Sequence, residues 1–175
     1  MSTIVGIECT DGALLAVDRL LVQHGRVEST SRDRLVVVDD AVGAVCVGPA
    51  GGVDEFIRQF EQEVRSYRTD RGEMGIDPLA TRVSSIAADE AVEAVVAGHD
   101  EDGVARIRMI GSDGGTLGDS PIARGTGASM LLGALEDEEM DLDTAESRIR
   151  EAFDTTASRD PKTGDEIDVW RLANE

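Results

Sequence analysis

The sequence predicts a single α+β domain, residues 1–175, in which antiparallel sheets are flanked by layers of helices. Segments that fit strands are grouped at the start, in the middle and at the end of the chain, and pairs of helical segments separate these groups. Grouped strands and grouped helices are typical of α+β folds, whereas parallel sheets need strands that alternate with helices. A chain of 175 residues without an internal repeat or linker is long enough to bury one core.

The first fifty residues contain strands arranged as two predicted hairpins. STIVGIECT alternates apolar and polar residues, Asp11-Gly12 is a typical hairpin turn, and ALLAVDR forms the returning strand. After an irregular polar stretch, RLVVVDD and AVGAVCVG form another close pair with only the two aspartates as a corner. We therefore expect antiparallel pairing within each hairpin.

The apolar period changes at Gly51 and predicts two helices. The first ends near Gly72 and carries one apolar stripe, made of Val53, Phe56, Ile57, Phe60, Val64 and Tyr67. A second, shorter helix covers residues 77–90, in which we expect Asp77 to cap the N-terminus and Pro78 to take the first helical position.

The second half of the chain shows the same division into strands and helices. A hairpin is predicted for EAVVAGHDEDGVARIRMIGSDGG, with an acidic turn and with Val104, Ile107 and Ile110 in its second strand. IARGTGASMLLGALE predicts a strand end, a glycine turn and the start of a helix. LDTAESRIREAFDTTASRD predicts a helix whose inward face is Leu142, Ala145, Ile149, Ala152 and Phe153. PKTGDEIDVWRL predicts a polar loop and a last strand.

The charge balance is strongly acidic and excludes some partners. Asp and Glu number 36 against 17 for Lys and Arg, which gives a net charge of -19, and Lys162 is the only lysine. A nucleic acid partner is not expected, because a polyanion is repelled where basic patches are absent. An acidic, lysine-poor surface stays hydrated in concentrated salt, where screening over about 3 Å at 1 M removes most self-repulsion. We therefore expect a halophilic source.

Cysteine, histidine and hydropathy patterns point to a cytoplasmic protein without a metal or cofactor. Cys9 and Cys46 lie inside apolar strands, so we expect buried thiols in a reducing cytosol and no disulfide framework. His24 and His99 are isolated and lack the spacing of metal ligands. No stretch approaches the roughly 18 apolar residues of a membrane span, so no membrane partner is expected.

The second residue of the chain could carry chemistry. If Met1 is removed, Ser2 has a free α-amino group beside its own hydroxyl. A hydroxyl is a nucleophile once a base takes its proton, and an α-amine with a reference pKa of about 7.7–8.0 can do so near neutral pH. A small residue after Met1 is also common for reasons of processing alone, so both interpretations stay open here.

Three segments resemble proteasome β-type subunits of the N-terminal-nucleophile hydrolase superfamily. STIVGIECTDGALLAVDR resembles their N-terminal hairpin, which begins with a nucleophilic threonine followed by Val-Gly-Ile and Asp-Gly. ARGTGASMLLGALE is similar to their glycine-serine-glycine turn and the helix after it, and SRDPKTGDEIDV to their Arg-Asp-x-x-Ser-Gly-Asp-x-Ile-Asp-Val signature. The three motifs occur in the family's order over nearly the whole chain, so the sequence is identified as a divergent haloarchaeal-type member.

The resemblance implies a four-layer αββα sandwich, with two stacked antiparallel sheets between helix layers. It also implies a subunit of a ring-shaped protein-degradation complex. The expected partners are copies of the same chain in a homo-oligomeric ring, stacked with other proteasome-like subunits in some arrangements. An active member would take unfolded peptide as its substrate.

The same resemblance implies roles for individual residues of this chain. Ser2 stands at the position of the catalytic threonine, and Asp18 at that of the acid on the second strand that holds a neighbouring cation. Arg34 takes the position of the essential lysine. It supplies positive charge and is expected to hold Asp18 bidentately, but it does not give up a proton.

Four further positions follow from the remaining motif residues. Gly48 matches the glycine whose N–H points at the oxyanion, where losing such a donor costs on the order of a hundredfold in rate. Thr126, Asp160 and Thr163 match the residues that hydrogen-bond the N-terminal amine and orient it. Outside the resemblance these four would be ordinary turn or bend residues.

Two more expectations concern the surroundings of this site. Lys162 stands between Asp160 and Thr163 and is a candidate to replace the missing ammonium, although a solvated loop charge is the simpler interpretation. A specificity pocket is expected around Leu21 and Cys46.

Three functions therefore remain open from the sequence. The first is peptide-bond hydrolysis through acylation of Ser2, as in a threonine or serine type N-terminal-nucleophile peptidase. The second, favoured by Arg34, is a catalytically silent ring subunit with a structural or regulatory role. The third is a non-proteolytic N-terminal-nucleophile amidohydrolase, suggested by the shortened middle of the chain.

Overall fold

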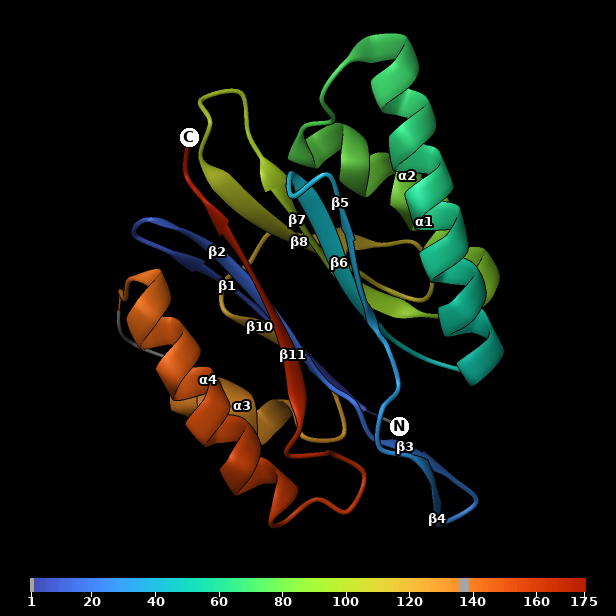
Figure 1. The fold of residues 1–175 in the computed structure, drawn as a ribbon, viewed down its shortest axis with the longest axis vertical. Coiled ribbons are helices and arrows are strands. Elements are labelled where there is room, and N and C mark those ends of the chain that lie inside the picture. The colour runs from blue at the N-terminus through green and yellow to red at the C-terminus, as the bar shows by residue number, and fades with distance from the viewer. Residues whose placement is uncertain (1, 136–138) are drawn as a thin grey trace.

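The computed structural model describes residues 2–135 and 139–175, which form an α+β sandwich. Helices α1 (Ala50–Arg71) and α2 (Ile76–Glu90) cover one side, and α3 (Ala128–Leu135) and α4 (Leu142–Ala157) cover the other, with two sheets between them (Figure 1). The predicted fold class is confirmed. Met1 and Glu136, which belong to two of the sequence motifs, lie outside the described residues.

The first sheet carries both ends of the described chain. Its strands follow the order β10-β1-β2-β11, and every neighbouring pair is antiparallel. The strands are β1 (Thr3–Cys9), β2 (Gly12–Asp18), β10 (Ile122–Gly125) and β11 (Ile167–Ala173). The N-terminal strand is thus central, and the segment that precedes it emerges beside the start of the β10–α3 turn.

The second sheet is built from the middle of the chain in the order β5-β6-β7-β8-β9, again with antiparallel neighbours. The strands are β5 (Leu35–Val38), β6 (Val42–Val47), β7 (Glu93–His99), β8 (Ala105–Ile110) and β9 (Thr116–Leu117). The two predicted hairpins in this region are confirmed. Val104, however, lies just before β8 and not in it.

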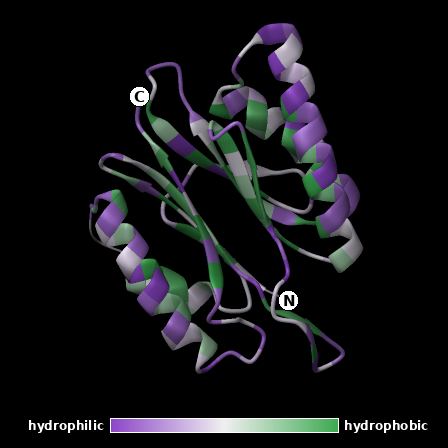
Figure 2. Ribbon diagram, viewed as in Figure 1, coloured by the Kyte–Doolittle hydropathy of each residue, from purple (hydrophilic) through white to green (hydrophobic). Residues whose placement is uncertain are grey.

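Three layers of apolar side chains hold the sandwich together. Figure 2 shows hydrophobic residues, in green, along the strands and on the helices that cover them. Phe56 and Phe60 of α1 are fully buried against the second sheet, and Phe153 of α4 is fully buried against the first. Between the sheets, Leu15 and Ile107 belong to a third cluster. Each sheet is therefore apolar on both faces, as a four-layer arrangement requires.

Two further local predictions are wrong. The stretch expected to be irregular contains a short antiparallel hairpin, β3 (Leu21–Gln23) and β4 (Arg26–Ser29). Most of its residues are solvent-exposed, so the sequence shows no pattern of buried residues that would predict strands. Asp77 does not cap α2. The helix begins at Ile76, two residues before the predicted first position Pro78, with Gly75 at the N-cap, and the Asp77 carboxylate pairs with Arg108 at 3.1 Å.

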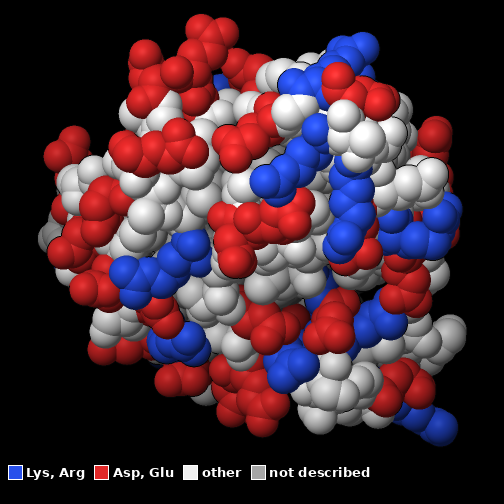
Figure 3. All heavy atoms as spheres, turned by 45° about the horizontal axis from the view of Figure 1, so that its top comes forward, with Lys and Arg blue, Asp and Glu red and all other residues white. Residues whose placement is uncertain are grey.

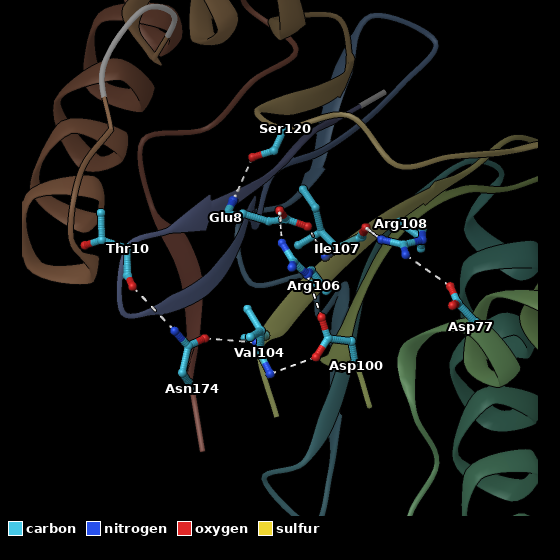
Figure 4. Close-up of polar contacts among 11 residues, drawn as sticks. Glu8, Thr10, Asp77, Asp100, Val104, Arg106, Ile107, Arg108, Ser120 and Asn174 are labelled. Carbon is cyan, nitrogen blue, oxygen red and sulfur yellow. Dashed lines mark hydrogen bonds and ion pairs between the residues drawn. The ribbon is translucent and has the colours of Figure 1, made fainter. Parts of the chain in front are cut away.

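A polar contact set joins the two sheets at the end of β1 that lies away from the N-terminus (Figure 4). Glu8 of β1 accepts hydrogen bonds from the Ile107 N–H at 3.1 Å and from Arg106 at 3.3 Å. Arg106 also donates to Asp100 at 2.9 Å. These three side chains are partly exposed, so they form a bridge at the rim of the sandwich and not in its core.

The surface agrees with the acidic composition. Acidic side chains cover much of the face drawn in Figure 3, with arginines set among them. Among the described residues, no helix combines the length and apolar composition that crossing a bilayer needs.

Candidate active site

A cavity of about 660 Å³ opens at the end of the sandwich where β1 begins. It is bordered by the β3 strand, the β6–α1 connection and the β10–α3 turn, which the antiparallel topology brings together at this end. Its lining residues include Ser2, Leu21, Val22, Gln23, Arg34, Val47, Gly48, Pro49, Ala50, Ala91, Glu93, Ser112, Arg124, Gly125 and Thr126. Four of the seven predicted site residues therefore line one cavity.

Ser2 and Asp18 form the centre of the site. Ser2 is 1% exposed and Asp18 is fully buried, and the Ser2 hydroxyl donates a hydrogen bond to Asp18 Oδ1. The same carboxylate accepts the Thr3 N–H at 3.0 Å and the Gly164 N–H at 2.7 Å. Burial raises the pKa of Asp18 above its usual value, although the two backbone N–H groups and the nearby Arg34 charge oppose that shift.

Arg34 lies next to Asp18 but does not hold its carboxylate, so that expectation is wrong. Its guanidinium donates to the Asp18 backbone carbonyl at 3.2 Å and to the Leu20 carbonyl at 2.9 Å. The backbone of Arg34 extends the second sheet, because its carbonyl accepts the Cys46 N–H at 3.1 Å. Burial lowers the pKa of Arg34, and the Asp18 charge works in the other direction. The guanidinium thus fixes the backbone at the end of β2 and just after it.

Thr126, Asp160 and Thr163 form a second cluster beside Ser2. Both threonine hydroxyls donate to Asp160 Oδ2 at 2.6 Å, and the Thr126 N–H donates to the Ser2 carbonyl at 3.3 Å. Burial disfavours the charged form of Asp160, but the two hydroxyls keep its pKa below the usual value. The structure therefore brings the three residues together and connects them to the N-terminal strand.

Thr3 and Gly164 belong to the site but were missed in the sequence. The fully buried Thr3 hydroxyl accepts the Gly127 N–H at 2.9 Å and lies 2.7 Å from the Thr163 hydroxyl oxygen. Thr3 therefore links the N-terminal strand to the Thr163 cluster. A threonine in an alternating strand does not by itself indicate a functional site, and Gly164 contributes only a backbone N–H. Neither residue was therefore predictable from its type.

The match to known proteins covers almost the whole chain. A model of the proteasome subunit family matches residues 1–172. The chain belongs to the proteasome subunit family. It is 30% identical over 182 residues to a proteasome subunit beta of Halobacterium salinarum, covering 99% of this chain and 74% of that protein.

Two further relatives come from other archaea. Proteasome subunit beta 1 of Staphylothermus marinus is 30% identical over 182 residues, covering 99% of this chain and 85% of that protein. Proteasome subunit beta of Methanohalophilus mahii is 28% identical over 180 residues, covering 98% and 86%. The proteasome β-type subunits identified by resemblance are thus confirmed as the relatives of this chain.

The remaining predicted residues of this proteasome-family chain fall in different places. Gly48 lines the cavity, and a Cβ there would lie 2.9 Å from Val92 Cγ1, so glycine suits the close packing of this corner. Leu21 also lines the cavity. The prediction for Cys46 is wrong, because its side chain is fully buried against the helix-facing side of the second sheet, where burial raises the pKa of its thiol to about 12.

Lys162 lies at the surface of the loop that carries Asp160 and Thr163. Its side chain is exposed, and its backbone N–H donates to Asp160 Oδ1 at 3.0 Å. Cys9 is half-buried, and both cysteines are free thiols.

Proposed function

We propose that this chain is a proteasome β-type subunit that hydrolyses peptide bonds through Ser2, and that residues 1–175 act as one catalytic domain. The observation that carries the proposal is Ser2, a residue that lines the cavity and whose hydroxyl is hydrogen-bonded to the buried Asp18 carboxylate. A hydroxyl held by an acceptor at the edge of a cavity is the arrangement that nucleophilic catalysis needs.

In the proposed reaction, Ser2 Oγ attacks the carbonyl carbon of a bound peptide. The N–H of Gly48, a residue that lines the cavity, is the proposed donor to the oxyanion. The tetrahedral intermediate then collapses, the C–N bond breaks, and an acyl ester remains on Ser2 until water hydrolyses it. Removal of Met1 would leave a free α-amine on Ser2, close to the cluster of Thr126, Asp160 and Thr163 that is proposed to orient it.

The walls of the cavity favour an apolar side chain beside the scissile bond. Six of the fifteen residues that line the cavity have aliphatic or small apolar side chains, namely Leu21, Val22, Val47, Pro49, Ala50 and Ala91. Its charged groups are already engaged, since Arg34 donates to backbone carbonyls and Arg124 lies 3.7 Å from Glu93. We propose a homo-oligomeric ring in the cytoplasm as the setting, in line with the chain's family.

The decisive experiment measures the intact mass of the purified chain with and without an α′,β′-epoxyketone peptide. This reagent forms a ring only with a hydroxyl and an adjacent free amine, so it reports both groups of a processed Ser2. We expect the mass without Met1 and one adduct, and no adduct on the matched variant Ser2→Ala. A chain that retains Met1 and gains no adduct would contradict the proposal.

A catalytically silent ring subunit is the second candidate, and one observation favours it. Arg34 donates to two backbone carbonyls, so the position that the family resemblance gives to a proton-carrying lysine is occupied by a group that stabilises the chain locally. This candidate predicts a ring by light scattering together with a folded chain that neither labels nor turns over peptides.

A further inference from the structure

We propose that the Asp18 carboxylate is itself the general base that takes the proton of the Ser2 hydroxyl. This inference rests on the proposed function, because it names the proton acceptor of the same reaction. In the sequence-based interpretation Asp18 only holds a cation, and the α-amine or a lysine takes the proton. The contacts around Asp18 support a different division of roles.

The first contact is the hydrogen bond from the Ser2 hydroxyl to Asp18 Oδ1, which sets donor and acceptor directly against each other without a mediating side chain. General-base catalysis requires the base to lie within hydrogen-bond reach of the proton that it removes. Arg34, by contrast, donates to the carbonyls of Asp18 and Leu20 and has no lone pair to accept a proton.

The second set of contacts fixes the carboxylate. The Thr3 N–H donates to Oδ1 at 3.0 Å, and the Gly164 N–H donates to Oδ2 at 2.7 Å. Two backbone donors from different segments hold the plane of the carboxylate, so that Oδ1 keeps facing Ser2. Arg34 donates to the Asp18 backbone carbonyl and acts on the carboxylate only through its charge, without a hydrogen bond to it, which makes Arg34 a positioning residue.

The third observation is the burial of the acid. Asp18 is fully buried, and burial raises its pKa above the ordinary value, which makes the carboxylate a stronger base than an exposed aspartate. Among the described residues, Arg34 is the charged group that opposes the shift. Asp160 accepts the Thr163 hydroxyl, and Arg19 pairs with Asp33 and Asp168.

Asp18 accepts and returns every proton that is transferred in the proposed reaction. As Ser2 Oγ bonds to the peptide carbonyl carbon, its proton moves to Asp18 Oδ1 and the carbonyl π electrons move to oxygen. When the C–N bond breaks, the leaving nitrogen takes that proton. In the second half, the attacking water gives a proton to Asp18, and the departing Ser2 Oγ takes it back.

The test is the pH dependence of Ser2 acylation by a β-lactone, measured as the rate of mass gain. A β-lactone needs only a hydroxyl, so the α-amine is not required for labelling. We expect the rate to rise with a single midpoint above the ordinary aspartate value of 3.8 and below the range of about 7.7–8.0 of an α-amine. Asp18→Asn should lose roughly 10²- to 10⁴-fold in rate and the midpoint with it.

Thr163→Val is the matched control, because it removes a hydroxyl from the neighbouring cluster without touching the Asp18 carboxylate. Its rate should fall while its midpoint stays. A midpoint near that of an α-amine that persists in Asp18→Asn would overturn the inference and leave the proposed function intact. A folded chain that is not acylated at any pH would overturn both. If Asp18→Asn does not fold, the midpoint of the unaltered chain decides alone.

Discussion

The two ends of strand β1 hold acids and arginines in different ways. At the end away from the N-terminus, Arg106 donates to the carboxylates of Glu8 and Asp100, and all three side chains touch solvent (Figure 4). The hydrogen bond with Arg106 is the main cause that lowers the pKa of Asp100, and the same bond raises the pKa of Arg106. Each group stabilises the charged form of the other.

At the N-terminal end the pKa values move in the opposite directions. Burial raises the pKa of Asp18 and lowers that of Arg34. The guanidinium donates to backbone carbonyls, and the carboxylate accepts the Ser2 hydroxyl and backbone N–H groups instead. The comparison teaches that an acid and an arginine close in space need not form an ion pair. Where backbone carbonyls take the guanidinium, the carboxylate remains free to accept a hydroxyl proton.

The largest expected effect comes from removing the buried guanidinium. Arg34→Met keeps an unbranched side chain but leaves the carbonyls of Asp18 and Leu20 without their donor. We expect the free energy of unfolding to fall by about 2–4 kcal/mol, since an unsatisfied buried polar group costs about 1–3 kcal/mol. Urea denaturation in concentrated salt measures this loss.

Arg106→Met at the other end is the matched control. Its side chain is 40% exposed, and exposed ion pairs contribute about 0–1 kcal/mol. Its free energy of unfolding should therefore change by less than about 1 kcal/mol. Equal losses in the two variants would mean that the two ends do not differ as described.

Much of the fold was predictable because apolar periodicity reports burial. Helices α1 and α4 were placed by their stripes, and the buried residues Val53, Phe56 and Phe153 lie where the stripes put them. The hairpin β3–β4 was not predictable, because its residues are mostly exposed and carry no alternating pattern. The N-cap of α2 was missed because Asp77 is a good capping residue type that instead pairs with a distant arginine.

The sequence motifs predicted several residues that the fold brings together at the cavity, but they did not predict the hydrogen bonds between them. Motif order placed Ser2, Asp18 and the Thr163 cluster, which the fold brings together. The hydrogen-bond partners of Arg34 could not be predicted, because every residue has a backbone carbonyl and the sequence does not show which ones lie near the guanidinium. Thr3 was missed for a related reason, since a threonine in a strand usually reflects β-propensity.

A smaller expected effect is that the two ends of β1 contribute to stability with opposite dependence on pH. The folded pKa of Asp18 is raised above 3.8, so its contribution is fully present below that value and is lost as pH rises through the folded pKa. The folded pKa of Asp100 is lowered, so its contribution is present above 3.8 and is lost as pH falls through the folded pKa.

Urea denaturation from about pH 2 to pH 7 tests these opposite signs in Asp18→Asn and Asp100→Asn. The unaltered chain should lose stability relative to Asp18→Asn as pH rises, and should gain stability relative to Asp100→Asn. Slopes of the same sign in both comparisons would show that Asp18 is ion-paired like the acids at the other end of β1.

The smallest expected effect concerns Lys162, whose ammonium is the alternative cation for the N-terminal end of β1. Its side chain is exposed, and only its backbone N–H contacts Asp160. An exposed charge acts through water, and in concentrated salt screening over about 3 Å at 1 M weakens it further. Lys162→Ala should therefore change the rate of Ser2 acylation by less than about twofold, a barrier change of under about 0.5 kcal/mol.

Lys162→Arg, which keeps the charge but cannot release a proton, is the matched variant. A drop of about tenfold in both variants would place a proton-carrying ammonium in the site and would remove the need for Asp18 as the base.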